Sequence, residues 1–306
     1  MKRCFLLVMI ICLISISDLA FAWEKSECYA KLIAPSVIRL DKQKIIPIEL
    51  QVLTPEGEPY SGPVTFSAQT ARFLTADGKY VFSLFTMEAA NGKAAVTLSL
   101  EGRNEYPSPL KIFASLGSDE LLAEAEIQVL YPANYKISAE VPAVVADGKQ
   151  RPRVSVMIFD QYDQPLDGVE ATVLFNGPGL EKLQDKGTTN QAGVADISLP
   201  ASSHVGYATC QVLNDFIATP QIYLLYTEQS MVLLPLRETV SRMGYRVNWD
   251  EKTRRVTIIG AVHRLIISEG QNLAKADGVL IPVGTTIKIR DGKLFVPTFF
   301  LRTVLY

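Results

Sequence analysis

Residues 45–59 read IIPIELQVLTPEGEP, an alternating apolar run that is followed directly by a turn-forming segment. Successive side chains of a β-strand point to opposite faces, so a run of this kind buries one face against a second sheet. Proline and glycine then supply the φ angles that a turn requires. Similar runs recur from Lys31 to Tyr226 without a competing helical period, which predicts an all-β sandwich fold.

The pattern occurs twice in the chain. The segment LTPEGEPYSG at 53–62 is echoed by FDQYDQPLDG at 159–168, and NGKAAVTL at 91–98 is echoed by AGVADISL at 192–199. A period of about 100 residues is typical of one β-sandwich and too long for one solenoid repeat. We therefore predict two immunoglobulin-like β-sandwiches in tandem, over residues 23–132 and 133–228.

The second copy resembles a bacterial group 1 immunoglobulin-like domain, the repeat that builds the stalks of invasin- and intimin-type adhesins. The resemblance is carried by VADG at 145–148, DQYDQP at 160–165 and TTNQAGVA at 188–195. The first copy departs from this pattern, since it lacks the Ala-Asp-Gly entry, and its membership depends on the internal repeat. The resemblance implies a spacer that holds another part away from a surface, without catalytic residues.

The pattern changes at Met231. LLPLRETVSRMG at 233–244 predicts a strand that enters a short helix, and 245–259 predicts a β-hairpin. Further strands are expected at 263–267, 286–289 and 294–296, with a second helix at the end of the chain. Together these elements predict a small C-terminal α/β (α+β) module over residues 229–306.

This module resembles the copper amine oxidase N-terminal-like domain. The matching motifs are LPLR at 234–237, Gly244-Tyr245, VNWD at 247–250 and VTI at 256–258. The resemblance implies an accessory module suspected of attachment to the cell envelope. It does not imply copper chemistry, because His204 and His263 are the only histidines and lie in different predicted domains. We therefore expect no metal and no cofactor.

The N-terminal segment predicts export. Lys2 and Arg3 precede an apolar run from Phe5 to Ile16, and the small residues Ala20 and Ala22 frame a cleavage site after Ala22. Residues 1–22 are thus expected to be a signal peptide, and no transmembrane span is expected in the mature chain. We expect a secreted or extracellular protein, associated with the cell envelope.

Charge is distributed unevenly along the chain. Residues 231–306 have a net charge of +6, whereas residues 23–230 have a net charge of −9. The imbalance favours an anionic partner for the C-terminal module, either a cell-wall or surface polymer or another surface protein, and disfavours nucleic acid for an exported chain. Solvated surface is the alternative explanation for the candidate binding residues, which are Arg237, Arg242, Arg246, Arg254, Arg255 and Arg264.

Motifs for catalysis are absent from the sequence: it has no Gly-x-Ser-x-Gly elbow, His-Glu-x-x-His helix or phosphate-binding glycine loop. The aspartates at 147, 160 and 163 fit turns better than a calcium site. Trp249 with Tyr245 offers either a sugar-stacking face or core packing, and core packing is favoured. Cys28 and Cys210 are too few for a disulfide framework, and pairing between chains stays open.

The leading interpretation is an exported non-catalytic protein of the surface or cell envelope, in which the sandwiches act as a spacer or stalk. The basic C-terminal module would then be the attachment or binding unit. The alternatives are a host or cell adhesin, and an exported enzyme accessory or metal-binding protein.

Overall fold

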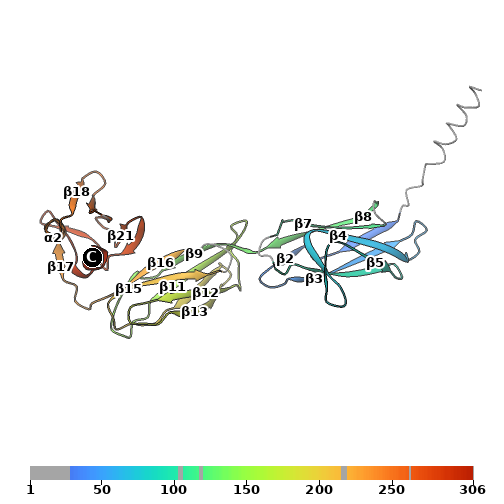
Figure 1. Cartoon of the computed structure of the whole chain (residues 1–306), viewed down its shortest axis with the longest axis horizontal. Helices are drawn as coiled ribbons and strands as arrows, with labels where there is room; N and C mark the ends of the chain where they lie inside the picture. The colour runs from blue at the N-terminus through green and yellow to red at the C-terminus, as the bar shows by residue number, and fades with distance from the viewer. Residues whose placement is uncertain (1–27, 103–105, 117–119, 215–218, 262, 306) are drawn as a thin grey trace, which may run out of the picture. The chain divides into compact units, whose positions relative to one another are not determined.

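The computed structural model describes residues 28–102, 106–116, 120–214, 219–261 and 263–305. The chain divides into two compact units, one ending at Leu130 and the other spanning Tyr131–Tyr306 (Figure 1). The predicted signal peptide and its cleavage site at Ala20 and Ala22 lie outside the described residues. No helix in the described part of the chain is long and apolar enough to cross a membrane.

The first unit is built from eight strands, blue to green in Figure 1. They run in the order β1-β3-β6-β4-β7-β8-β2, with β5 attached to β4. The strands are β1 (Tyr29–Ile33), β2 (Val37–Arg39), β3 (Ile45–Leu53), β4 (Gly62–Leu74), β5 (Tyr80–Ala89), β6 (Lys93–Ser99), β7 (Leu110–Leu116) and β8 (Glu120–Leu130).

Strand β4 joins the two layers of this sandwich. Its first part pairs with β7 and its last three residues pair with β6. An irregularity between Ser67 and Arg72 separates the two parts, and Thr70 there has a φ of 63°. Bulges of this kind let one strand pass from one sheet to the other.

The predicted alternation is confirmed in β3. Its even-numbered residues are buried within this sandwich, namely Ile46, Ile48, Leu50 and Val52. Burial of one face of a strand against a second sheet is the main source of stability for a sandwich, because the apolar area leaves water.

The second unit begins with a sandwich of the same topology. Its five-stranded sheet has the order β10-β16-β15-β12-β13 and its three-stranded sheet has the order β14-β11-β9. Strand β10 pairs in parallel with the last strand β16, as β2 does with β8 in the first unit. The strands are β9 (Pro132–Ala139), β10 (Ala143–Val145), β11 (Arg153–Asp160), β12 (Glu170–Asn176), β13 (Leu183–Thr188), β14 (Val194–Ser198), β15 (Gly206–Leu213) and β16 (Gln221–Thr227). The prediction of two immunoglobulin-like sandwiches is confirmed.

The repeated sequence motifs have one physical basis in both sandwiches. Gly92 has a φ of 74° and Gly193 a φ of 72°. The carbonyl of each accepts a backbone hydrogen bond of 2.9 Å, from Val52 and from Ile158 respectively. A Cβ atom on Gly193 would lie 2.9 Å from the Cβ of Pro165, so the glycine lets one turn lie against another.

The C-terminal module packs two short helices with two small sheets. The sheets have the orders β18-β19-β20-β21-β22 and β17-β24-β23. The elements are β17 (Leu233–Pro235), α2 (Leu236–Arg242), β18 (Arg246–Asp250), β19 (Arg255–Ile259), β20 (Arg264–Ser268), β21 (Leu273–Ala276), β22 (Val279–Pro282), β23 (Lys288–Arg290), β24 (Lys293–Pro297) and α3 (Thr298–Leu305). The predicted strand–helix entry, hairpin and terminal helix are present, whereas β21 and β22 were not predicted.

The module and the second sandwich have separate hydrophobic clusters. They meet at Tyr207 of β15, whose hydroxyl donates a 2.6 Å hydrogen bond to the carbonyl of Pro282. The ring centroid of Tyr207 also lies 6.3 Å from that of Phe299. Burial raises the pKa of Tyr207, because the apolar surroundings disfavour the phenolate. The second sandwich and the module are therefore parts of one compact unit.

Candidate functional site on the C-terminal module

Three of the predicted arginines share the outer face of the five-stranded sheet. Arg246 of β18 and Arg264 of β20 both lie directly opposite Ile259 of β19, so they flank it on the two neighbouring strands. Arg255 lies farther along β19, opposite Asp250. Directly opposite residues of antiparallel strands point to the same face. All three arginines are exposed.

A fourth cation on this face was not predicted as a site residue. Lys275 of β21 lies opposite Ile266 of β20, and Ile266 lies opposite Thr257 of β19. Lys275 is exposed. It was missed because residues 273–282 were not recognised as a hairpin, although Asp277-Gly278 is a turn signal of the same kind as Asp291-Gly292. We call Arg246, Arg255, Arg264 and Lys275 the basic face.

Two carboxylates border the basic face, and each already has partners. Asp250 accepts backbone hydrogen bonds from Lys252 and Thr253 at the start of the β18–β19 turn. Asp277 accepts the backbone N–H of Arg264 at 2.7 Å and binds the ring of His263 at 2.8 Å. The Arg264 amide, followed by His263, holds the pKa of Asp277 below its usual value.

The other predicted arginines lie elsewhere. Arg254 belongs to the β18–β19 turn and forms an ion pair with Glu269, which lowers the pKa of that carboxyl. Arg237 and Arg242 belong to α2. This helix lies on the core side of the sheet, because its buried residues join the same cluster as the inward-facing side chains of β19 and β20. The structure thus brings together three of the six predicted arginines.

Trp249 lines a hollow of about 420 Å³ on the core side of the module. Arg237 and the ion pair between Glu238 and Lys293, at 2.5 Å, lie on its rim. Trp249 also packs against the hydrophobic cluster of the module. Tyr245 takes no part in the hollow, since its hydroxyl donates to the carbonyl of Leu305 at 2.8 Å. The paired Trp249–Tyr245 face considered from the sequence is therefore not formed.

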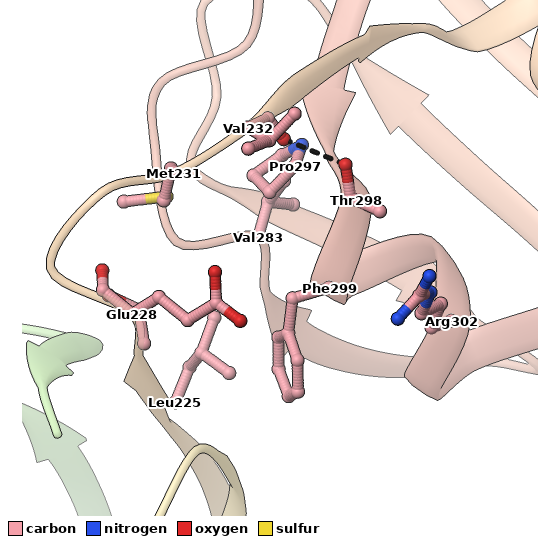
Figure 2. Close-up of a pocket in the computed structure, with 10 residues that line it drawn as sticks. Leu225, Glu228, Met231, Val232, Val283, Pro297, Thr298, Phe299 and Arg302 are labelled. Carbon is pink, nitrogen blue, oxygen red and sulfur yellow. Dashed lines mark hydrogen bonds between the residues drawn. The ribbon is translucent and has the colours of Figure 1, made fainter.

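A second hollow, of about 230 Å³, lies where the module meets the second sandwich (Figure 2). Leu225 and Phe299 line it from the two sides, and Glu228 and Arg302 contribute its ionisable groups. The Thr298 hydroxyl donates a 3.0 Å hydrogen bond to the carbonyl of Val232 and ties α3 to the chain that enters the module. The lining of this hollow is therefore mixed, with apolar side chains beside the charged Glu228 and Arg302.

The remaining polar candidates have structural partners. One oxygen of Asp147 accepts the backbone amides of Lys149 and Gln150, and one oxygen of Asp160 accepts those of Tyr162 and Gln164. Asp163 has a φ of 59° and accepts a hydrogen bond from the side chain of Asn134. Within the described residues, no group of three or more histidine, cysteine, aspartate or glutamate side chains is placed to hold a metal ion.

Cys210 forms no disulfide. Cys210 is fully buried in β15, and burial raises the pKa of its thiol to about 12. It packs as a small apolar side chain within the core of the second sandwich. Cys28 is half-buried.

Comparison with known protein families assigns the C-terminal part of the chain. Residues 218–305 match the family described as Copper amine oxidase N-terminal domain. The C-terminal module is similar to that domain. The match confirms the resemblance to the copper amine oxidase N-terminal-like domain that the sequence motifs of the module predicted. No curated protein matches the sequence.

Several solved structures are similar to the chain. FdeC, an adhesin of Escherichia coli, is 18% identical over 65% of this chain and 64% of its own, with a TM-score of 0.38. Invasin, a bacterial integrin-binding protein, is 17% identical over 88% of this chain and 54% of its own, with a TM-score of 0.29. A glycosyl hydrolase family 2 member from Bacteroides cellulosilyticus is 11% identical over 67% and 29%, with a TM-score of 0.26. The chain spans less than two thirds of the length of each.

Proposed function

We propose that this is an exported, non-catalytic protein of the surface or cell envelope, in which the two sandwiches act as a spacer. The copper amine oxidase N-terminal-like module is the attachment unit, and its basic face binds a phosphate- or carboxylate-rich surface polymer. The observation that carries the proposal is the gathering of Arg246, Arg255, Arg264 and Lys275 on one exposed sheet face.

The chemistry of the basic face supports an anionic polymer as the ligand. Guanidinium groups present donors that match phosphate and carboxylate geometry. The two bordering carboxylates, Asp250 and Asp277, each accept hydrogen bonds from neighbouring backbone amides, and Asp250 also lies opposite Arg255. Cations spread over one exposed sheet face suit an extended chain of repeating anionic groups better than one small molecule.

The test is sedimentation of the purified chain with cell-wall fragments at low and high salt. We expect binding at low salt that falls steeply at about 1 M salt, because the screening length shrinks from about 10 Å at 0.1 M to about 3 Å. A triple variant, Arg246→Ala, Arg255→Ala and Arg264→Ala, should lose at least about tenfold in affinity, near 1.4 kcal/mol.

The matched control is the double variant Arg237→Ala and Arg242→Ala, which removes cations of the same module from helix α2. It should bind the wall as the unchanged chain does. Equal losses in both variants would show that net charge alone matters and would reject the basic face as the site. Binding that is insensitive to salt would reject electrostatic attachment altogether.

A further inference from the structure

An exposed isoleucine lies between two arginines of the basic face. Ile259 of β19 is directly opposite Arg246 on one neighbouring strand and Arg264 on the other. Directly opposite residues of antiparallel strands share one face, with Cβ atoms about 4.5–5.5 Å apart. Ile259 is nevertheless 40% exposed, so the stems of the two arginines do not cover it.

The same arrangement is repeated around the lysine of this face. Lys275 of β21 lies opposite Ile266 of β20 and opposite Leu280 of β22. Ile266 is half-buried, whereas Leu280 is 59% exposed on the last strand of the sheet. Cations and aliphatic side chains therefore alternate across the strands of one sheet face.

This pattern differs from ordinary surface exposure. Single exposed aliphatic side chains are common on proteins, whereas several on one face mark an interaction surface. Aliphatic side chains stabilise a complex only where they leave water. A hydrated polymer of charged groups has no apolar phase, so Ile259 and Leu280 would stay in water when the basic face binds one. Such a polymer therefore accounts for the cations of the face but not for its aliphatic side chains.

An anionic lipid layer accounts for both kinds of side chain. The four cations of the basic face outnumber its two bordering carboxylates, Asp250 and Asp277, so the face complements an anionic surface. Electrostatic attraction to anionic lipid and burial of apolar area act together when a protein binds at a membrane surface. Long cationic side chains reach the headgroups while their aliphatic neighbours enter the apolar boundary.

A protein partner fits the face less well. Protein interfaces are centred on tryptophan and tyrosine anchors and contain little lysine. Trp249 is the only Trp, Tyr or Phe residue in the segment 246–282, and it packs against the hydrophobic cluster on the core side of the module. The outward positions of this sheet thus carry no aromatic anchor.

We propose that the basic face also docks on the surface of a lipid layer that carries phosphate headgroups. Arg246, Arg264 and Lys275 contact the headgroup phosphates. Ile259 and Leu280 enter the boundary between the headgroups and the acyl chains. The inference rests on the proposed function for the use of the basic face, and it adds a lipid surface as a second ligand of that face.

The first experiment is co-sedimentation of the purified chain with vesicles at low salt. Vesicles of equal parts phosphatidylglycerol and phosphatidylcholine are compared with vesicles of phosphatidylcholine alone, and we expect binding to the first kind only. The triple variant Arg246→Ala, Arg255→Ala and Arg264→Ala should bind about fivefold more weakly for each arginine removed, since each cation near an anionic surface contributes about that factor.

The aliphatic side chains are tested by Ile259→Ser with Leu280→Ser, which leaves every charge in place. This double variant should bind the anionic vesicles at least about tenfold more weakly. The matched control is Met231→Ser with Val232→Ser, in the chain that enters β17 and outside the basic face. Their exposed fractions, 40% and 61%, match those of the two residues on the face. The control should bind as the unchanged chain does, and both double variants should keep its melting temperature.

Detergent-washed cell-wall fragments, which carry polymer without lipid, separate this inference from the proposed function. Ile259→Ser with Leu280→Ser should bind these fragments as the unchanged chain does. Vesicle binding that is absent, equal on both kinds of vesicle, undiminished in this double variant or equally diminished in its control would overturn the lipid inference and leave wall binding untouched. Vesicle binding without wall binding would instead reject the proposed function alone.

A fluorescent probe tests entry into the lipid layer. An environment-sensitive dye is attached to Leu280→Cys, in a chain without the predicted signal peptide and with Cys28→Ser. Cys210 is fully buried and should not react with the dye. The emission should shift to shorter wavelength on the anionic vesicles, whereas the same dye on Val232→Cys should show no shift. Equal shifts at both positions, or none at Leu280→Cys, would contradict docking through the basic face.

Discussion

Thr189 of the second sandwich is a buried polar residue that is held by two specific hydrogen bonds. Thr189 is almost completely buried after β13. Its hydroxyl donates a 2.6 Å hydrogen bond to the carbonyl of Leu166 and accepts a 2.9 Å hydrogen bond from the backbone of Val169. Thr189 belongs to the TTNQAGVA segment that carries the family resemblance, so a polar residue at this position was known from the sequence. Its partners were not, because they come from a different turn.

We predict that Thr189→Val lowers the free energy of unfolding by about 1–3 kcal/mol, because the isosteric change leaves a buried carbonyl and a buried amide without partners. Urea denaturation measures this loss. The control is Thr209→Val in β15, at a half-buried strand position, which should change stability by about 0.5 kcal/mol or less. Equal losses of unfolding free energy at both sites would show that the hydrogen bonds of Thr189 do not stabilise the sandwich.

At the scale of elements, turns and strands were predicted unequally well. The strand β3 and the β18–β19 hairpin follow from local alternation. The hairpin of β21 and β22 was missed because its strands are short and alternate weakly, even though Asp277 and Gly278 have the positive φ angles of a tight turn. The path of β4 between two layers was also not predictable, since it depends on pairing with β6 and β7, which are distant in sequence.

The repeated glycine turns give a prediction at this scale. Gly193→Ala should lower the free energy of unfolding by about 3 kcal/mol. The added Cβ would lie only 2.8 Å from the carbonyl oxygen of Ile158, and the positive φ adds backbone strain. Gly57→Ala is the control, since Gly57 has a φ of 85° but open space around its Cβ position. It should cost only about 1 kcal/mol. Chemical denaturation measures both, and a reversed order would refute the close approach of the two turns.

At the scale of the whole molecule, charge is divided between an acidic body and a basic module. Within the module, several carboxylates are engaged by cations or amides. Lys293 lowers the pKa of Glu238, Arg254 lowers that of Glu269, and the Arg264 amide lowers that of Asp277. The surface of the module is therefore organised by ion pairs as well as by its overall charge.

These shifts predict how stability depends on pH. A carboxyl whose pKa is lower in the folded state stabilises the fold above its unfolded pKa, and this contribution is lost as pH falls through the folded pKa. The melting temperature should thus be constant between about pH 5 and pH 8 and fall at lower pH. Glu269→Gln should reduce the decrease in melting temperature at low pH, and Glu251→Gln in the nearby turn is the control. A melting temperature that rises on acidification would contradict the prediction.

The sequence by itself determined most of the strands, the tandem repeat and the family resemblance of the module, because alternation, turn chemistry and short motifs act between residues that are close in the chain. Only the tertiary structure decided that Arg246, Arg255 and Arg264 share a face with Lys275 while Arg237 and Arg242 do not. It also decided that Tyr207 joins the module to the second sandwich. The physical reason is that strand register and helix placement depend on contacts between distant segments, and these fix the direction in which each exposed side chain points.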